Sequence, residues 1–150
     1  MSDVAGDLGA SSGPASRGKV EQIFLAHTGA AEPTAVLEAE VEAGKGLRGD
    51  RYANGTGTFS SSIKPGRHVT LIESEAIEAV RREHGLDVSP SDPRRNVVTS
   101  GVRLNDLVGV RFSVGDAVLQ GIRLCEPCDH LERLTGIEGL KKAYHGTSPR

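Results

Sequence analysis

Short apolar runs bounded by glycine, proline and other turn residues recur along this 150-residue chain, whereas a single stretch has the length and charge pattern of a helix. The runs with the character of strands are residues 19–26, 35–42, 67–72, 96–99 and 110–124. The helix is predicted over residues 73–85, with Ser74 as its N-cap and Gly85 as its C-cap. Many short strands with one mid-chain helix favour a mainly β fold with a few short helices, built as a closed or partly closed β-barrel rather than as a βαβ array.

Alternation of apolar residues predicts two strand pairs. Leu37, Ala39 and Val41 alternate with glutamates, which indicates a strand with one face in water, antiparallel to the strand at 19–26. The clearest hairpin has Gly115-Asp116 as its two-residue turn. The apolar residues on its two arms are Val110, Phe112, Val114, Val118, Ile122 and Leu124.

Composition argues against several classes of function. Aromatic residues make up 3% of the chain, so stacking platforms for bases are scarce, and a net charge of −2 provides no field that would attract nucleic acid or an anionic membrane. No apolar run has the length of a transmembrane helix, and the N-terminus lacks the pattern of a signal peptide. We therefore expect a cytoplasmic protein, with a disordered leader at residues 1–18 and one domain at residues 19–150.

Residues 43–66 are rich in glycine and have no sustained period, so we expect a long loop without regular structure that serves a site. Residues 44–49 match the pattern G-x-G-x-x-G, but the turn residues at 50–57 are not expected to open the helix that a dinucleotide-binding turn requires. The cations that could join backbone N–H groups in binding an anion are Lys45, Arg48 and Arg51. A flexible, solvated loop is the equally weighted alternative.

Cys125-Glu126-Pro127-Cys128 is the single CxxC motif, and it allows three functional interpretations besides a pair of buried core thiols. A structural zinc site typically has two such pairs, and here only His130 and the distant His145 could complete the ligand set. A thioredoxin-like dithiol belongs near the start of a βαβ unit, whereas this motif follows a hairpin. The third interpretation is a single thiolate that acts as a nucleophile or binds a soft metal. Pro127 suits a first helical position, so Cys128 is predicted in the first helical turn, where the helix dipole favours a thiolate.

Several segments that are weak signals alone form a recognisable order. They are Gly49-Asp50, Arg67-x-Val69-Thr70-Leu71-Ile72, Arg94-Arg95-Asn96-Val97, Gly115-Asp116, Cys125-x-Pro127-Cys128 and His130-Leu131. Together they resemble the MOSC domain, a module named for the C-terminal region of molybdenum cofactor sulfurases. The resemblance covers about residues 20–145 and implies a β-barrel fold.

The resemblance implies a function that depends on Cys128. This cysteine would bind the molybdenum of a molybdenum-molybdopterin cofactor or carry sulfur as a persulfide, with Cys125 as an auxiliary thiol. The residues implied to line the pterin pocket are Arg94, Arg95 and Asn96, and those implied for the cofactor phosphate are Lys45, Arg48 and Arg67. The chain would then be a molybdenum-dependent oxidoreductase that reduces N-hydroxylated compounds, or a sulfur transferase. Pyridoxal phosphate binding is a further property implied by the resemblance.

The end of the chain departs from the family pattern. Family members continue past a position like His145 with a further strand, whereas this sequence stops at Arg150, so we expect a barrel without its last strand. An open barrel edge would favour a homo-oligomer or pairing with another chain. The partner proteins implied are a sulfur donor or a redox protein. The alternative from another class is a non-catalytic binding or interaction module, a remnant of a MOSC domain without cofactor.

Overall fold

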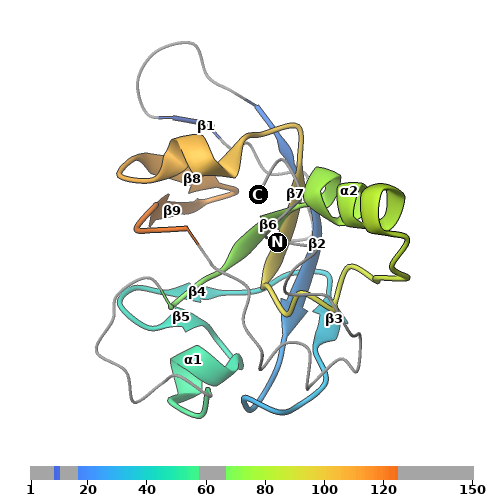
Figure 1. The fold of residues 1–150 in the computed structure, drawn as a ribbon. Helices are drawn as coiled ribbons and strands as arrows, with labels where there is room; N and C mark the ends of the chain where they lie inside the picture. Colours follow the sequence, from blue (N-terminus) through green and yellow to red (C-terminus); the bar gives the residue numbers. More distant parts are fainter. Residues whose placement is uncertain (1–8, 11–16, 58–66, 125–150) are drawn as a thin grey trace.

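The computed structural model describes residues 9–10, 17–57 and 67–124, which form a mainly β structure (Figure 1). The strands are β1 (Gly9–Ala10), β2 (Lys19–Leu25), β3 (Thr34–Val36), β4 (Val41–Glu42), β5 (Gly46–Leu47), β6 (Leu71–Glu73), β7 (Val97–Ser100), β8 (Arg111–Val114) and β9 (Ala117–Gln120). The helices are α1 (Arg51–Asn54), α2 (Ser74–His84) and the 3-10 helix η1 (Leu104–Leu107). The expected mainly β fold with a few short helices is therefore confirmed.

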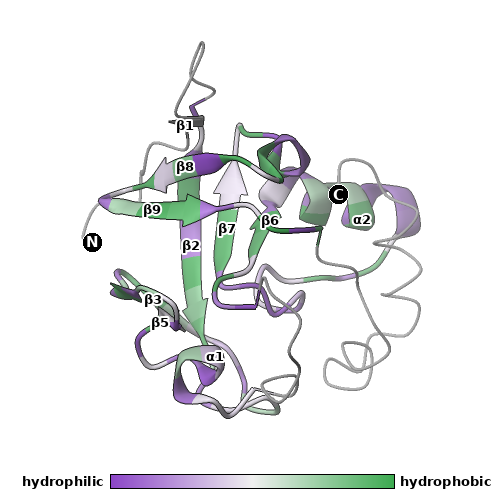
Figure 2. Ribbon diagram, turned by 90° about the vertical axis from the view of Figure 1, so that its left-hand side faces the viewer, coloured by the Kyte–Doolittle hydropathy of each residue, from purple (hydrophilic) through white to green (hydrophobic). Residues whose placement is uncertain are grey.

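The strands form three sheets. The largest has the order β3-β2-β7-β6, with β2 antiparallel to β3 and β7, and β6 parallel to β7. The second has the order β1-β8-β9, and the third pairs β4 with β5. Figure 2 shows β8 and β9 crossing the direction of β2 and β7. Among the described strands these sheets do not join into one closed barrel, and barrel closure stays a prediction.

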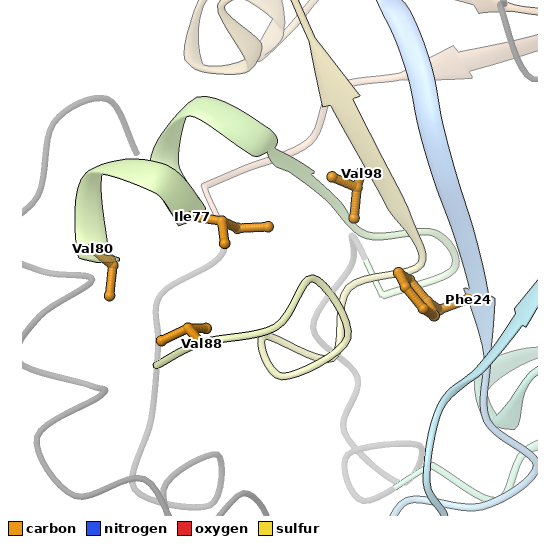
Figure 3. Close-up of a cluster of buried hydrophobic side chains, with 5 residues drawn as sticks. All are labelled: Phe24, Ile77, Val80, Val88 and Val98. Atoms are coloured by element: carbon orange, nitrogen blue, oxygen red, sulfur yellow. The ribbon is translucent and has the colours of Figure 1, made fainter. Parts of the chain in front are cut away.

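The parallel pair β6–β7 is joined through α2, so the structure contains one βαβ connection. The sequence patterns did not predict such a unit. The helix buries one face, because its apolar residues recur at helical spacing. Figure 3 shows the resulting cluster between α2 and the main sheet, which consists of Phe24, Ile77, Val80, Val88 and Val98. This packing fixes the start of α2, and with it the end of β6, relative to the sheet.

Two further clusters lie away from α2. One joins β2, β5 and β7 and contains Val20, Ile23, Leu47 and Val97. The other joins η1 to the hairpin and contains Val102, Leu107 and Phe112. Leu71 of β6 and Val114 of β8 pack against both clusters, so they connect the hairpin to the main sheet.

The predicted hairpin is confirmed as β8–β9, with Gly115 in the left-handed conformation at φ 58°. Phe112 is buried, as the alternation predicts, and it pairs with Leu119, which packs against the same cluster. Val118 is instead 67% exposed. On the returning arm it is therefore the partly buried Leu119, rather than Val118, that packs against the core, because directly paired residues share one face of a hairpin.

Three local expectations are wrong. Residues 35–42 are not one strand, since β3 ends at Val36, Leu37 is 80% exposed and the chain resumes in β4, which pairs with β5. The N-cap of α2 is Glu73 rather than Ser74, although Gly85 is the C-cap as expected. The stretch 43–66 contains β5 and α1, so its described part is not a loop without regular structure.

Helix α1 shows why the turn-rich stretch after Gly49 opens a helix. Asp50 is its N-cap and accepts a hydrogen bond from the Tyr52 N–H at 3.4 Å, and Gly55 ends the helix in the left-handed conformation. The helix has four residues, and the carboxylate of Asp50 occupies its N-terminus. The prediction that no helix starts here is therefore wrong. The Tyr52 N–H of this terminus donates to Asp50 and the Arg51 N–H to the carbonyl oxygen of Ala26, rather than to a phosphate.

Within the segment expected to be a leader, β1 pairs with β8, and Ala10 lies opposite Phe112. The helical turn predicted at Pro127, the CxxC motif and the chain end lie outside the described residues. No helix in the described part of the chain is long and apolar enough to span a membrane.

Candidate functional site

A cavity of about 560 Å³ lies between the β8–β9 hairpin, η1, the approach to β6 and the β4–β5 turn. Its volume falls within the roughly 300–1,000 Å³ typical of small-molecule pockets. All the exposed large hydrophobic residues that the structure describes, except Leu37, line it: Val41, Val108, Val118, Ile122 and Leu124. Apolar side chains left accessible in a concave place indicate a surface kept for a ligand.

Two glycines allow the walls of the cavity to approach each other. A Cβ atom added at Gly121 would lie 1.9 Å from the carbonyl oxygen of Leu107, where the end of β9 meets η1. A Cβ atom at Gly46, whose φ is +125°, would lie 2.3 Å from the carbonyl oxygen of His68. Both contacts are far shorter than a side chain permits, so glycine at these positions shapes the cavity.

Glu73, the last residue of β6, is a 4% exposed carboxylate in the cavity wall. Its Oε2 accepts a hydrogen bond from the Leu104 N–H at 3.1 Å, which ties η1 to β6. It makes no capping bond to α2. Burial raises the pKa of Glu73; the Leu104 bond opposes this shift, and the charge of Glu75 adds to it.

Arg94 and Arg95 are adjacent in sequence but have different surroundings. Arg94 has the positive φ of 58°, uncommon for a residue with a side chain. Its guanidinium donates to the carbonyl oxygens of Ala31 at 2.8 Å and Gly29 at 2.9 Å, and burial together with the nearby charge of Arg51 lowers the pKa of Arg94. Arg95 lines the cavity. Arg94 therefore stabilises the loop after β2, whereas Arg95 is placed to contact a ligand in the cavity.

Asn96 is fully buried, and its side chain bonds to protein groups. Its Oδ1 accepts hydrogen bonds from the Thr70 N–H at 3.1 Å and the Thr70 hydroxyl at 3.2 Å, and its Nδ2 donates to the Phe24 carbonyl at 3.1 Å. Asn96 joins β2 to the segments that lead into β6 and β7. It does not contribute to the cavity lining.

A buried ion pair holds the segment around α1. Arg51 Nη1 lies 3.1 Å from Asp50 Oδ1, and both side chains are at most 8% exposed. The same Oδ1 accepts from the Ala26 N–H at 3.1 Å, and Arg51 Nη2 donates to the Arg94 carbonyl at 3.0 Å. Arg51, one of the predicted anion-binding cations, is thus used to connect β2, α1 and the residues before β7.

The three cations implied for a phosphate are not among the described lining residues, although each is bonded to or adjacent in sequence to one of them. Arg48 is exposed and forms ion pairs with Glu40 and, at 2.8 Å, with Glu42. The bond from Arg48 lowers the pKa of Glu42. Lys45 is exposed in the β4–β5 turn, next to lining residues, and Arg67 is partly buried before β6.

Most polar groups of the cavity were not predicted as site residues from the sequence. They include Glu42, His68, Thr70, Glu73, Asn105, Gln120 and Arg123. Glu73 had the appearance of an acidic residue at a helix start, Thr70 belonged to a family segment without an assigned role, and no motif marked the others. Cys125, Cys128 and His130 lie outside the described residues. Within the described ranges, no group of three His, Cys, Asp or Glu side chains is placed to hold a metal ion.

The fold and cavity define a mainly β protein with a cavity lined by both apolar and polar side chains. The sequence model of the MOSC domain matches residues 58–149, more than half of the chain. The chain therefore belongs to the MOSC domain family. The resemblance carried by the short segments is confirmed.

A solved structure with a similar fold is that of the YuaD protein from Bacillus subtilis. It aligns with a TM-score of 0.65 at 20% sequence identity and covers 85% of this chain and 79% of that chain. At this identity the likeness supports the fold alone. A search of curated proteins gives no match.

Proposed function

We propose that this chain binds a molybdopterin-type cofactor in the cavity, or carries sulfane sulfur, and that Cys128 is the residue on which either function depends. Family membership supports the cofactor class, since this family is associated with the molybdenum cofactor. A cytoplasmic location and a sulfur-donor or redox partner protein belong to the same proposal.

The observation that carries the proposal is the continuity between the cavity and the CxxC motif. Leu124 lines the cavity, and Cys125 follows it directly. Cys128 is four residues beyond Leu124, so at most about 14 Å of extended chain separates them. A connection of this length would allow the thiol to reach a ligand in the cavity.

The described residues fit a flat heterocycle that bears an anionic group. The apolar residues of the hairpin and η1 can pack against a ring and exclude water, and Arg95 offers a guanidinium suited to a phosphate. Cys128 would supply the soft thiolate ligand. When bound, the molybdenum centre would supply the redox step for reduction of N-hydroxylated compounds, because such chemistry belongs to the cofactor.

Substitution of each cysteine tests the proposal. Protein made in a host that synthesises the cofactor is analysed for molybdenum, pterin and cyanide-labile sulfur. Cys128→Ser should lose the molybdenum or the labile sulfur, whereas Cys125→Ser should retain most of it. Equal losses with release of zinc would instead indicate a structural metal site. If both variants load fully, or if the wild type loads neither group, a non-catalytic binding module is the better account.

A further inference from the structure

Glu73 places more charge in the cavity wall than the fold requires. One oxygen accepts the Leu104 N–H at 3.1 Å, and an amide side chain could accept that bond equally well. The second oxygen has no hydrogen-bond partner among the described residues. A carboxylate offers about four acceptor positions, so Glu73 retains capacity for a ligand.

No cation in the described chain forms an ion pair with this carboxylate. The charged groups that act on it are Glu75 from α2, Arg103 from the segment before η1 and Asp106 from η1. Arg103 is itself paired with Asp106 at 3.6 Å, and both are exposed. A buried carboxylate without a cation is costly, and such groups concentrate at functional sites.

We propose that Glu73 is the specificity-determining residue of the cavity and accepts hydrogen bonds from an amidine- or guanidine-type edge of the ligand. Such an edge presents N–H groups on two nitrogens bonded to one carbon, which matches the planar carboxylate. The inference rests on the proposed function of the cavity. The edge has two chemical sources, the amino-substituted ring of a pterin and an amidine-type substrate.

Two matched pairs of probes test this assignment by equilibrium binding. Pterin and lumazine differ in the amino group of that edge, which is an oxo group in lumazine. Benzamidine and benzamide form the second pair, which represents the amidine-type substrate. Benzamide has an oxo group in place of one nitrogen of the amidine. The variant is Glu73→Gln, which keeps an acceptor for Leu104, and the control is Glu42→Gln, in another carboxylate of the same cavity.

Wild-type protein should bind pterin at least tenfold more tightly than lumazine, or benzamidine at least tenfold more tightly than benzamide. Glu73→Gln should abolish that preference, and Glu42→Gln should preserve it. If Glu73→Gln loses the preference only within the pterin pair, the cofactor is the source of the recognised edge. If it loses the preference only within the benzamidine pair, the substrate is the source. Benzamidine binding by the wild type should also weaken on acidification through the raised pKa of Glu73, a measurement that needs no variant.

Three results would overturn the inference: a preference that survives in Glu73→Gln, equal loss in Glu42→Gln, or a wild type that binds none of the four probes. Failure of the proposed function is separate. A Glu73-dependent preference in a protein that never loads molybdenum or labile sulfur would reject the cofactor and sulfur roles while supporting the assignment of Glu73.

Discussion

Asn96 and Thr70 are joined by three hydrogen bonds of 3.1–3.2 Å that involve both side chains and both backbone N–H groups. The Asn96 side chain also donates to the carbonyl oxygen of Phe24. One buried amide thus fixes β2 and the segments leading into β6 and β7, and β6 carries Glu73 to the cavity.

We expect Asn96→Ala to lower the free energy of unfolding by about 2–4 kcal/mol, because it leaves buried polar groups of Thr70 and Phe24 without partners. Urea denaturation followed by circular dichroism measures the change. Asn105→Ala is the control, since Asn105 is exposed. Similar effects of the two substitutions would show that the Asn96 bonds contribute little.

The ion pairs of Arg51 and Arg48 should differ strongly in their effect on stability. Asp50→Ala leaves the buried guanidinium of Arg51 uncompensated and should cost about 3–5 kcal/mol. Glu40→Ala breaks an exposed pair with Arg48 and should cost less than about 1 kcal/mol. Thermal unfolding at low and high salt checks both, and an Asp50 effect as small as the Glu40 effect would contradict the structure.

The raised pKa of Glu73 has a defined consequence for stability. The folded protein holds this proton to a higher pH than the unfolded chain, whose ordinary value is 4.5. As the pH rises from 4.5 through the raised pKa, Glu73 lowers the stability of the folded state. Glu73→Gln should therefore melt at a higher temperature than wild type at pH 7, with the difference vanishing below pH 4.5. A lower melting temperature for the variant at pH 7 would contradict this sign.

Glycine at position 46 should be far less replaceable than glycine at position 44. Both have positive φ, but a Cβ at Gly46 would meet the His68 carbonyl, whereas none of the surrounding atoms lies within 4 Å at Gly44. We expect Gly44→Ala to cost about 1–2 kcal/mol from backbone strain alone. Gly46→Ala should cost more and weaken ligand binding, because His68 lines the cavity. Chemical denaturation and binding of pterin measure the two effects.

Local chemistry explains what could be predicted from the sequence. The hairpin turn at Gly115 and the helix end at Gly85 depend on residues a few positions apart, and both are where the patterns indicate. Arg95 was identified from a motif, and it lines the cavity.

Contacts between distant residues explain why the roles of Glu73, Asp50 and Asn96 could not be predicted from the sequence. Glu73 reaches the cavity because β6 pairs in parallel with β7 and because Leu104 returns to its carboxylate. Asp50 has the character of an exposed turn residue, yet the N–H of Ala26 and the guanidinium of Arg51 make its complete burial favourable. The pairing of β2 with β7 similarly determines that Asn96 meets Phe24 rather than a ligand.

The position of β2 also has consequences for how the chain acquires its structure. β2 lies between β3 and β7, and Ile23 pairs with Val97, yet β2 precedes the family-matched residues 58–149. During synthesis β2 leaves the ribosome on the order of several seconds before β7, and until then its hydrogen-bonding edge on that side has no native partner. A shortened chain that begins at residue 58 would contain β7 but lack β2. The edge of β7 that pairs with β2 would then be open to aggregation.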